Sequence, residues 1–230
     1  MATIYLIRHG QAQFGMEDYD ALSPTGIGQA KLLGKSLQQR GIIPTKIISG
    51  AMKRHQQTMQ YCLENMQLQQ LPAQMMEEWN EFDHRDVLNK YEPRYTDLNE
   101  LKKDIFLDSN PKAKITEVLT GAITRWVGGQ QLDYNESWVD FSARILSGLN
   151  KVKDASAKDD TVLLFTSGGS ISVVMQHILE LPLQKTFELQ LNIANCSVTK
   201  IKTSSLGWRL LTFSDHAHFT GENSKWLTYK

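Results

Sequence analysis

The chain has 230 residues, which is long enough for one α/β domain with a sizeable core and an insertion. Its 25 lysines and arginines match 25 aspartates and glutamates, so it has no global field that would attract nucleic acid or an anionic membrane. Cys62 and Cys196 lack the spacing of a disulfide framework or a thiolate zinc site, which indicates a reducing compartment. No apolar stretch approaches the roughly 20 residues that span a bilayer, and the opening residues lack a basic segment before their apolar run. We therefore expect a cytoplasmic protein that binds neither nucleic acid nor membrane.

Short apolar strands alternate with amphipathic helices in the first third of the chain, which predicts a parallel sheet. The run at residues 4–7 is β-branched and aromatic, as is typical of a central strand covered on both faces. Ser23 can cap a helix that begins at Pro24 and ends near Gly41. The elements predicted here are a strand at 4–7, a helix from 24 to about 41, a strand at 46–49, a helix at 51–66 and a strand at 74–78.

The pattern changes after the third predicted strand. Residues 87–129 lose the strand pattern and gain prolines and charges, which predicts a helical insertion in a single domain of residues 1–230. Residues 161–166, TVLLFT, form the clearest buried strand of the chain. The elements predicted here are a helix at 115–127 within the insertion, a helix at 137–153, a strand at 161–166, a helix from the following turn to about 181, and a hairpin of strands at 196–201 and 208–213 with its turn at 204–207.

Two arginines and a histidine follow strands of the predicted sheet. Arg8 and His9 stand where the first strand ends, and Arg54 lies about one turn into the helix after the second strand. Ligands of open α/β sheets bind at such strand ends, which share one edge of a parallel sheet. Two guanidinium groups suit a phosphate, and an imidazole beside them can attack it. The alternative is that His9 is a surface histidine and that Arg54 belongs to a solvated basic face.

Two further segments could complete a phosphate site. Residues 77–86 carry several carboxylates; we expect most to be solvated in a loop, but one could protonate a leaving oxygen. Residues 166–170, TSGGS, place backbone N–H groups at a helix N-terminus directly after a buried strand, which suits an anion. The alternative for this second segment is a tight turn made by glycine.

Five motifs, spread over nearly three quarters of the chain, occur in the same order as in a known protein family. They are LIRHGQA at 6–12, LSPTGIGQA at 22–30, the segment 49–58 with Arg54, Glu81 after the third strand, and TVLLFTSGG at 161–169. Through this ordered set the chain resembles the histidine phosphatase superfamily, the phosphoglycerate mutase-like proteins. The resemblance implies a three-layer α/β sandwich with a mostly parallel central sheet, helices on both faces, a helical insertion and a C-terminal antiparallel hairpin.

The resemblance also implies roles for the motif residues. His9 would be the nucleophile that becomes phosphohistidine, and Glu81 would be the general acid and base. Arg8 and Arg54 would clamp the phosphoryl oxygens, and because they and the helix-end amides supply positive charge, no metal or other cofactor is expected. A backbone carbonyl near Gly10 is the expected acceptor that fixes the tautomer of His9. The residues expected to bind phosphate or substrate are Ser167, Gly168, Gln11 and His84.

One position departs from the family pattern. Members usually carry a second histidine, which bonds the phosphoryl group, where this chain has Ser167. A serine offers one neutral hydrogen bond and no charge, and loss of one donor to developing charge costs about a hundredfold to a thousandfold in rate. We expect Ser167→His to raise turnover unless a compensating group is already in place. The expected substitutes are His84 first, then His216 and His218, whereas His55 and His177 are expected to be structural.

The expected function is hydrolysis of a small phosphomonoester, with low activity if the change at Ser167 is not compensated. Two alternatives stay open: a phosphoglycerate mutase, which returns the phosphoryl group to a bound product, and a phosphate-ester binding protein that has lost catalysis. The sequence FDHRDVL at 82–88 differs from the glyceromutase pattern, which counts against the first. The presence of His9 and Glu81 counts against the second, because a binding protein needs neither a nucleophile nor a general acid.

Overall fold

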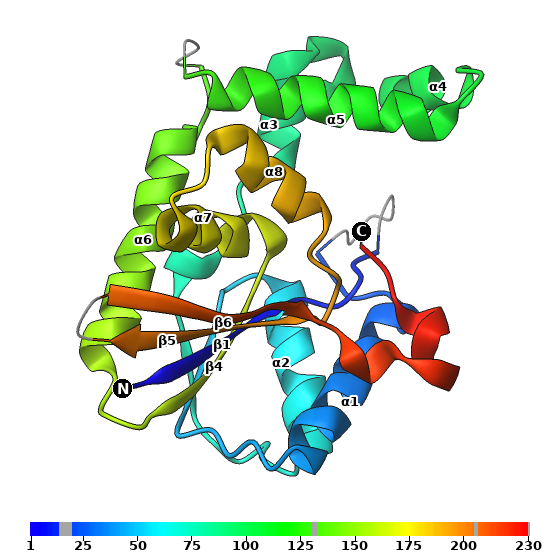
Figure 1. Ribbon diagram of the computed structural model, residues 1–230. Helices are drawn as coiled ribbons and strands as arrows, with labels where there is room; N and C mark the ends of the chain where they lie inside the picture. Colours follow the sequence, from blue (N-terminus) through cyan, green and yellow to red (C-terminus); the bar gives the residue numbers. More distant parts are fainter. Residues whose placement is uncertain (14–19, 130–132, 205–206, 230) are drawn as a thin grey trace. The chain divides into compact units, whose positions relative to one another are not determined.

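The computed structural model describes residues 1–13, 20–129, 133–204 and 207–229 (Figure 1). The chain divides into two compact units, one made of Met1–Glu81 and Arg144–Lys230 and the other of Phe82–Ala143. Within the described ranges, no helix is both long and apolar enough to cross a membrane.

The first unit is built on a mixed sheet whose strands, among the described residues, lie in the order β3-β2-β4-β1-β5-β6. The strands β3, β2, β4 and β1 are parallel neighbours, whereas β5 is antiparallel to β1 and to β6. The registers align Arg8 with Thr166 and Ser49 with Phe165, so β1, β2 and β4 end at one edge of the sheet. The strand bounds are β1 Thr3–Arg8, β2 Lys46–Ser49, β3 Ala73–Met75, β4 Thr161–Thr166, β5 Val198–Ser204 and β6 Gly207–Asp215.

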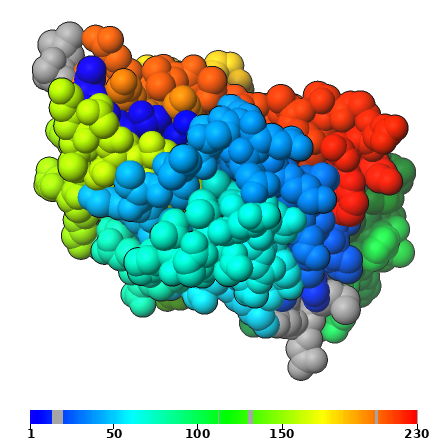
Figure 2. All heavy atoms as spheres, turned by 90° about the horizontal axis from the view of Figure 1, so that it is seen from below, coloured from blue at the N-terminus to red at the C-terminus, as the bar shows by residue number. Residues whose placement is uncertain are grey.

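Helices of the first unit cover both faces of this sheet (Figure 1). On one face lie α1 (Pro24–Gln39) and α2 (Lys53–Met66), and on the other lie α7 (Gly168–Leu179), α8 (Leu183–Leu191) and the part of α6 (Trp138–Ala155) that begins at Arg144. Figure 2 views the molecule from the side of α1 and α2 and shows the C-terminal segment, in red, beside α1. That segment contains the 3₁₀ turns η3 (Ala217–Phe219) and η4 (Gly221–Trp226), and a third such turn, η1 (Glu77–Trp79), follows β3.

The main core lies between the sheet and the pair α1 and α2. Both cysteines are buried free thiols within it. Gly34 lets the two helices approach closely, because a Cβ atom there would lie 2.3 Å from the Cys62 carbonyl oxygen. The buried members of this core are Tyr5, Ile7, Ala30, Leu33, Leu37, Ile47, Cys62, Leu63, Met66, Leu163, Phe165, Cys196, Val198 and Phe219.

The second unit is helical and contains the insertion predicted at 87–129. It comprises α3 (His84–Tyr91), the 3₁₀ turn η2 (Pro93–Thr96), α4 (Leu98–Phe106) and α5 (Pro111–Val127). Side chains of Asp83, Asp97 and Asn110 cap the three α-helices by accepting backbone N–H groups. The prediction of a single helix here, at 115–127, is therefore wrong, because three local caps begin three helices.

The other predicted elements can now be compared with the structure. The cap at Ser23, whose side chain accepts the Gly26 N–H, is confirmed, as are the strands at 46–49 and 161–166. The third strand is shorter than predicted because Glu77 and Glu78 enter η1, and α8 was not predicted. The hairpin is confirmed. Residues 205–206 of its predicted turn lie outside the described residues, as do residues 14–19 of the polar stretch that the sequence predicts at 11–22.

Candidate active site

His9 leaves the end of β1 and is buried with a defined orientation. Its Nδ1 lies 2.7 Å from the carbonyl oxygen of Gly10, the contact that the sequence predicts. A carbonyl can only accept, so Nδ1 carries the proton and Nε2 carries a lone pair. Burial, followed by the nearby Arg54 and Arg8, holds the pKa of His9 well below 6.5. The imidazole is therefore neutral near pH 7 and keeps a nucleophilic nitrogen.

The glycine after His9 is required by close packing against α1. A Cβ atom on Gly10 would lie 2.5 Å from the Gly26 carbonyl oxygen. The Gly10 N–H donates to Thr58 Oγ1 at 3.0 Å, and that hydroxyl donates to the Arg54 carbonyl oxygen at 2.7 Å. The loop that carries His9 is thus tied directly to the first turns of α2.

Arg8 and Arg54 bring two guanidinium groups to the same edge of the sheet. Arg54 is 4% exposed and pairs with Asp20 at 2.6 Å. Arg8 donates to the carbonyl oxygens of Ile193 and Tyr229. Its Nε lies 3.5 Å from the position of a Cβ atom on Gly168, which places Arg8 beside the N-terminus of α7. Because that helix end also carries partial positive charge, this edge of the sheet suits an anion.

Glu81 reaches the same helix end from the loop after η1. Its Oε2 accepts the Gly169 N–H at 2.9 Å, and a Cβ atom on Gly169 would lie only 2.1 Å from its Oε1. The second glycine of TSGG therefore leaves the space that the carboxylate occupies. The loop itself is anchored by Arg144, whose Nη1 donates to the carbonyl oxygens of Glu77, Glu78 and Asn80 at 3.1, 2.9 and 3.0 Å.

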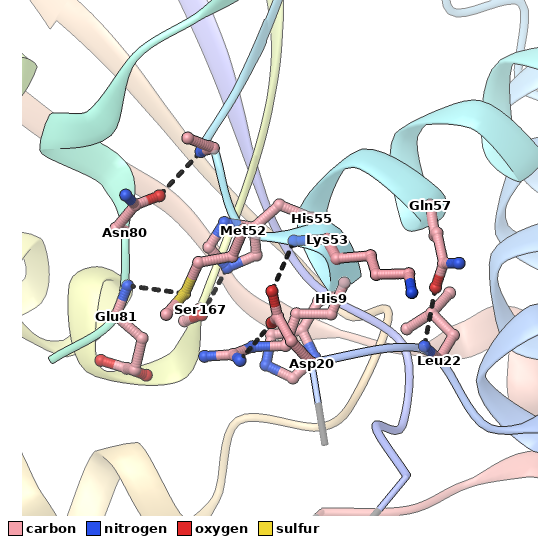
Figure 3. Close-up of polar contacts among 12 residues, drawn as sticks. His9, Asp20, Leu22, Met52, Lys53, His55, Gln57, Asn80, Glu81 and Ser167 are labelled. Atoms are coloured by element: carbon pink, nitrogen blue, oxygen red, sulfur yellow. Dashed lines mark hydrogen bonds and ion pairs between the residues drawn. The ribbon is translucent and has the colours of Figure 1, made fainter. Parts of the chain in front are cut away.

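Ser167 faces a histidine of α2 across the site (Figure 3). His55 is fully buried, and its Nε2 lies 2.6 Å from Ser167 Oγ. The ring centroids of His55 and His9 are 5.7 Å apart. Burial, followed by Arg54, holds the pKa of His55 well below 6.5. The contact between His55 and Ser167 is not predicted by the sequence, which indicates only a structural role for His55.

A family model matches most of the chain. The model for the histidine phosphatase superfamily (branch 1) matches residues 4–216. The chain belongs to the histidine phosphatase superfamily.

Solved structures of similar fold include enzymes of this superfamily's phosphoglycerate mutase-like type, which confirms the predicted fold. A phosphoglycerate mutase from Bacillus anthracis is 21% identical over 97% of this chain and 96% of its own, with a TM-score of 0.65. A mycobacterial glucosyl-3-phosphoglycerate phosphatase is 21% identical over 92% of this chain and 98% of its own, with a TM-score of 0.63. A phosphoserine phosphatase from Entamoeba histolytica, solved with 3-phosphoglyceric acid, is 18% identical over 95% of this chain and 99% of its own, with a TM-score of 0.62.

The structure brings together most of the residues that the superfamily resemblance selects. Arg8, Gly168, Glu81 and Ser167 meet around the first turn of α7. Gln11 lies at the neighbouring loop, where its side-chain oxygen accepts the Ser23 hydroxyl at 2.9 Å. The grouping of these side chains agrees with a phosphate site, and their individual roles stay predictions.

Each of the three histidines expected to replace the family's second histidine has a contact within its own unit. His84 begins α3 in the second unit, where its ring lies 4.2 Å from that of Phe82. His216 Nδ1 bonds the Ser214 carbonyl oxygen at 2.6 Å, and the His218 ring packs on Phe219 at 4.1 Å. Among the described residues, the histidine hydrogen-bonded to Ser167 is His55.

Proposed function

We propose that this protein is a phosphomonoester hydrolase that works through a phosphohistidine on His9. The observation that carries the proposal is the 2.7 Å contact between His9 Nδ1 and the Gly10 carbonyl, which leaves Nε2 as a neutral nucleophile beside two guanidinium groups. A small phosphorylated substrate agrees with the phosphoserine phosphatase and glucosyl-3-phosphoglycerate phosphatase of similar fold.

In the first step, His9 Nε2 attacks phosphorus and the bond from phosphorus to the ester oxygen breaks. Glu81, in its acid form, gives its proton to the leaving oxygen, so an alcohol departs. Arg8, Arg54 and the amides that begin α7 balance the charge on the phosphoryl oxygens. This reaction requires no metal and no other cofactor.

In the second step, water attacks the phosphohistidine. Glu81, now a carboxylate, takes a proton from the water as its oxygen bonds to phosphorus. The bond from Nε2 to phosphorus breaks, inorganic phosphate leaves, and both His9 and Glu81 return to their starting forms. We place this reaction in the cytoplasm, since the two buried cysteines are free thiols.

The test is release of phosphate from an aryl phosphate by wild type and His9→Ala, with His177→Ala as the control because His177 is exposed on α7. We expect His9→Ala to lose activity and His177→Ala to retain it. Rapid quenching with labelled substrate should trap an acid-labile phosphoryl group on wild type and on His177→Ala but not on His9→Ala. Equal phosphate release by wild type and His9→Ala would falsify the proposal. Transfer of label to an added acceptor alcohol in preference to water would instead identify a mutase.

A further inference from the structure

His55 extends from α2 to Ser167, the residue that precedes the first turn of α7. Ser167 is the N-cap of α7, but its side chain makes no capping hydrogen bond within the described chain. The hydroxyl faces His55 instead, and the Gly169 N–H that a cap could bind is donated to Glu81. The serine is thus held toward the site by a residue 112 positions away.

The turn before α2 is shaped to admit the His55 ring. A Cβ atom on Gly50 would lie 2.3 Å from His55 Nδ1, so a side chain at this position would collide with the imidazole. Any larger residue at position 50 would therefore require the His55 ring to shift. The absence of a side chain at Gly50 therefore leaves the space that the His55 ring occupies.

The direction of the contact between His55 and Ser167 depends on which ring nitrogen of His55 carries the proton. Nδ1 of His55 is buried and has no partner among the described residues. Either neutral form of the ring leaves Nδ1 unpaired, as a donor or as an acceptor, and the form that suits a phosphate site carries its proton on Nε2. Nε2 then donates to Ser167 Oγ, and the serine hydroxyl keeps its own proton to donate elsewhere.

We propose that His55 is a positioning residue that orients and polarises the Ser167 hydroxyl to donate to a phosphoryl oxygen, and that the pair replaces the family's second histidine. This inference rests on the proposed function, since it names a donor of the same site. Hydrogen bonds in such a chain strengthen one another, so the serine becomes a better donor than it would be alone. The proton stays on Ser167, and no bond to its oxygen forms or breaks.

The test is a double-mutant cycle on kcat/KM and on the affinity for inorganic phosphate. Because His55 acts through Ser167, we expect His55→Ala to lower kcat/KM about tenfold to hundredfold when Ser167 is present. In the Ser167→Ala background the same change should cost less than about twofold. His55→Gln, which retains a donor, should recover part of the loss, and thermal unfolding of each variant shows that it is folded.

Moving the histidine from position 55 to position 167 gives a second test. Ser167→His alone should lower activity, because Ser167 Oγ is already 2.6 Å from His55 Nε2 and a second ring would displace the first. His55→Ala combined with Ser167→His makes room for a ring at the usual family position and should restore kcat/KM to within about tenfold of wild type.

The outcomes of these experiments separate the inference about His55 from the proposed function. An equal loss from His55→Ala in both backgrounds would overturn the inference. So would a His55→Ala, Ser167→His double variant whose kcat/KM is no higher than that of His55→Ala alone. Acid-stable phosphate trapped on Ser167 would also overturn it, because the serine would then be a nucleophile. If phosphate affinity follows the expected cycle while no His9-dependent turnover occurs, the proposed function fails and the inference holds. If neither turnover nor phosphate binding is found, both fail.

Discussion

Gly169→Ala is expected to separate activity from stability. The added Cβ atom would lie 2.1 Å from Glu81 Oε1 and 2.9 Å from its Cδ, whereas an ordinary contact needs about 3.5 Å. The carboxylate must therefore move by about 1 Å, and a misplacement of that size can cost about a hundredfold in rate. The φ of Gly169 is not positive, so alanine fits the helical backbone there. We expect kcat/KM to fall about a hundredfold with no decrease in the melting temperature.

The assay for Gly169→Ala compares two leaving groups. A nitrophenolate needs little help from an acid, whereas an alkoxide must be protonated as it departs. If Glu81 supplies that proton, kcat/KM for an alkyl phosphate should fall more than kcat/KM for nitrophenyl phosphate. Using kcat/KM keeps the comparison on the first step, before hydrolysis of the intermediate. Gly168→Ala should lose less, because its methyl group would lie 3.5 Å from Arg8 Nε. Equal losses for both esters would refute the assignment of Glu81 as the acid.

Two further predictions concern the surroundings of the site. Arg144→Ala should lower kcat/KM about tenfold and the free energy of unfolding by about 1–3 kcal/mol, because Arg144 Nη1 binds three carbonyls of the loop that carries Glu81. A loss of stability with unchanged activity would show that the position of Glu81 does not depend on Arg144. Burial lowers the pKa of His218 to about 4, so the unfolded chain takes up this proton first as pH falls below 6.5. The stability contribution of His218, up to about 3 kcal/mol, should be complete above pH 6.5 and lost between pH 6.5 and 4. In urea unfolding across that window, His218→Gln should therefore reduce the pH dependence of the free energy of unfolding, and an unchanged pH dependence would contradict this.

Elements with local signals were predictable from the sequence. Ser23 and Pro24 mark the start of α1, and the continuous apolar run of β4 marks a strand buried on both faces. The caps of the second unit, Asp83, Asp97 and Asn110, are local signals too, whereas the prediction of a single helix at 115–127 rests on the apolar period alone.

The contact between His55 and Ser167 could not be predicted from a local pattern. His55 follows Lys53 and Arg54, and such a run is typical of a solvated helix face. Only the sheet order, which places β4 between β1 and β2, brings the first turn of α2 to the N-terminus of α7. The available sequence signal is the absence of the usual histidine at position 167, which predicts a substitute but does not place it on the helix after β2.

The geometry also explains why a donor can move between elements without changing the site. The first turn of α7 lies at the shared edge where β1, β2 and β4 end, so a side chain can reach it from the end of its own strand or from α2. A histidine at position 167 would follow directly after β4, whereas His55 belongs to α2, and Gly50 leaves room for its ring. The serine then joins the displaced imidazole to the site through one hydrogen bond. A motif compared position by position shows only the loss at Ser167, because the compensating change lies on another element of the fold.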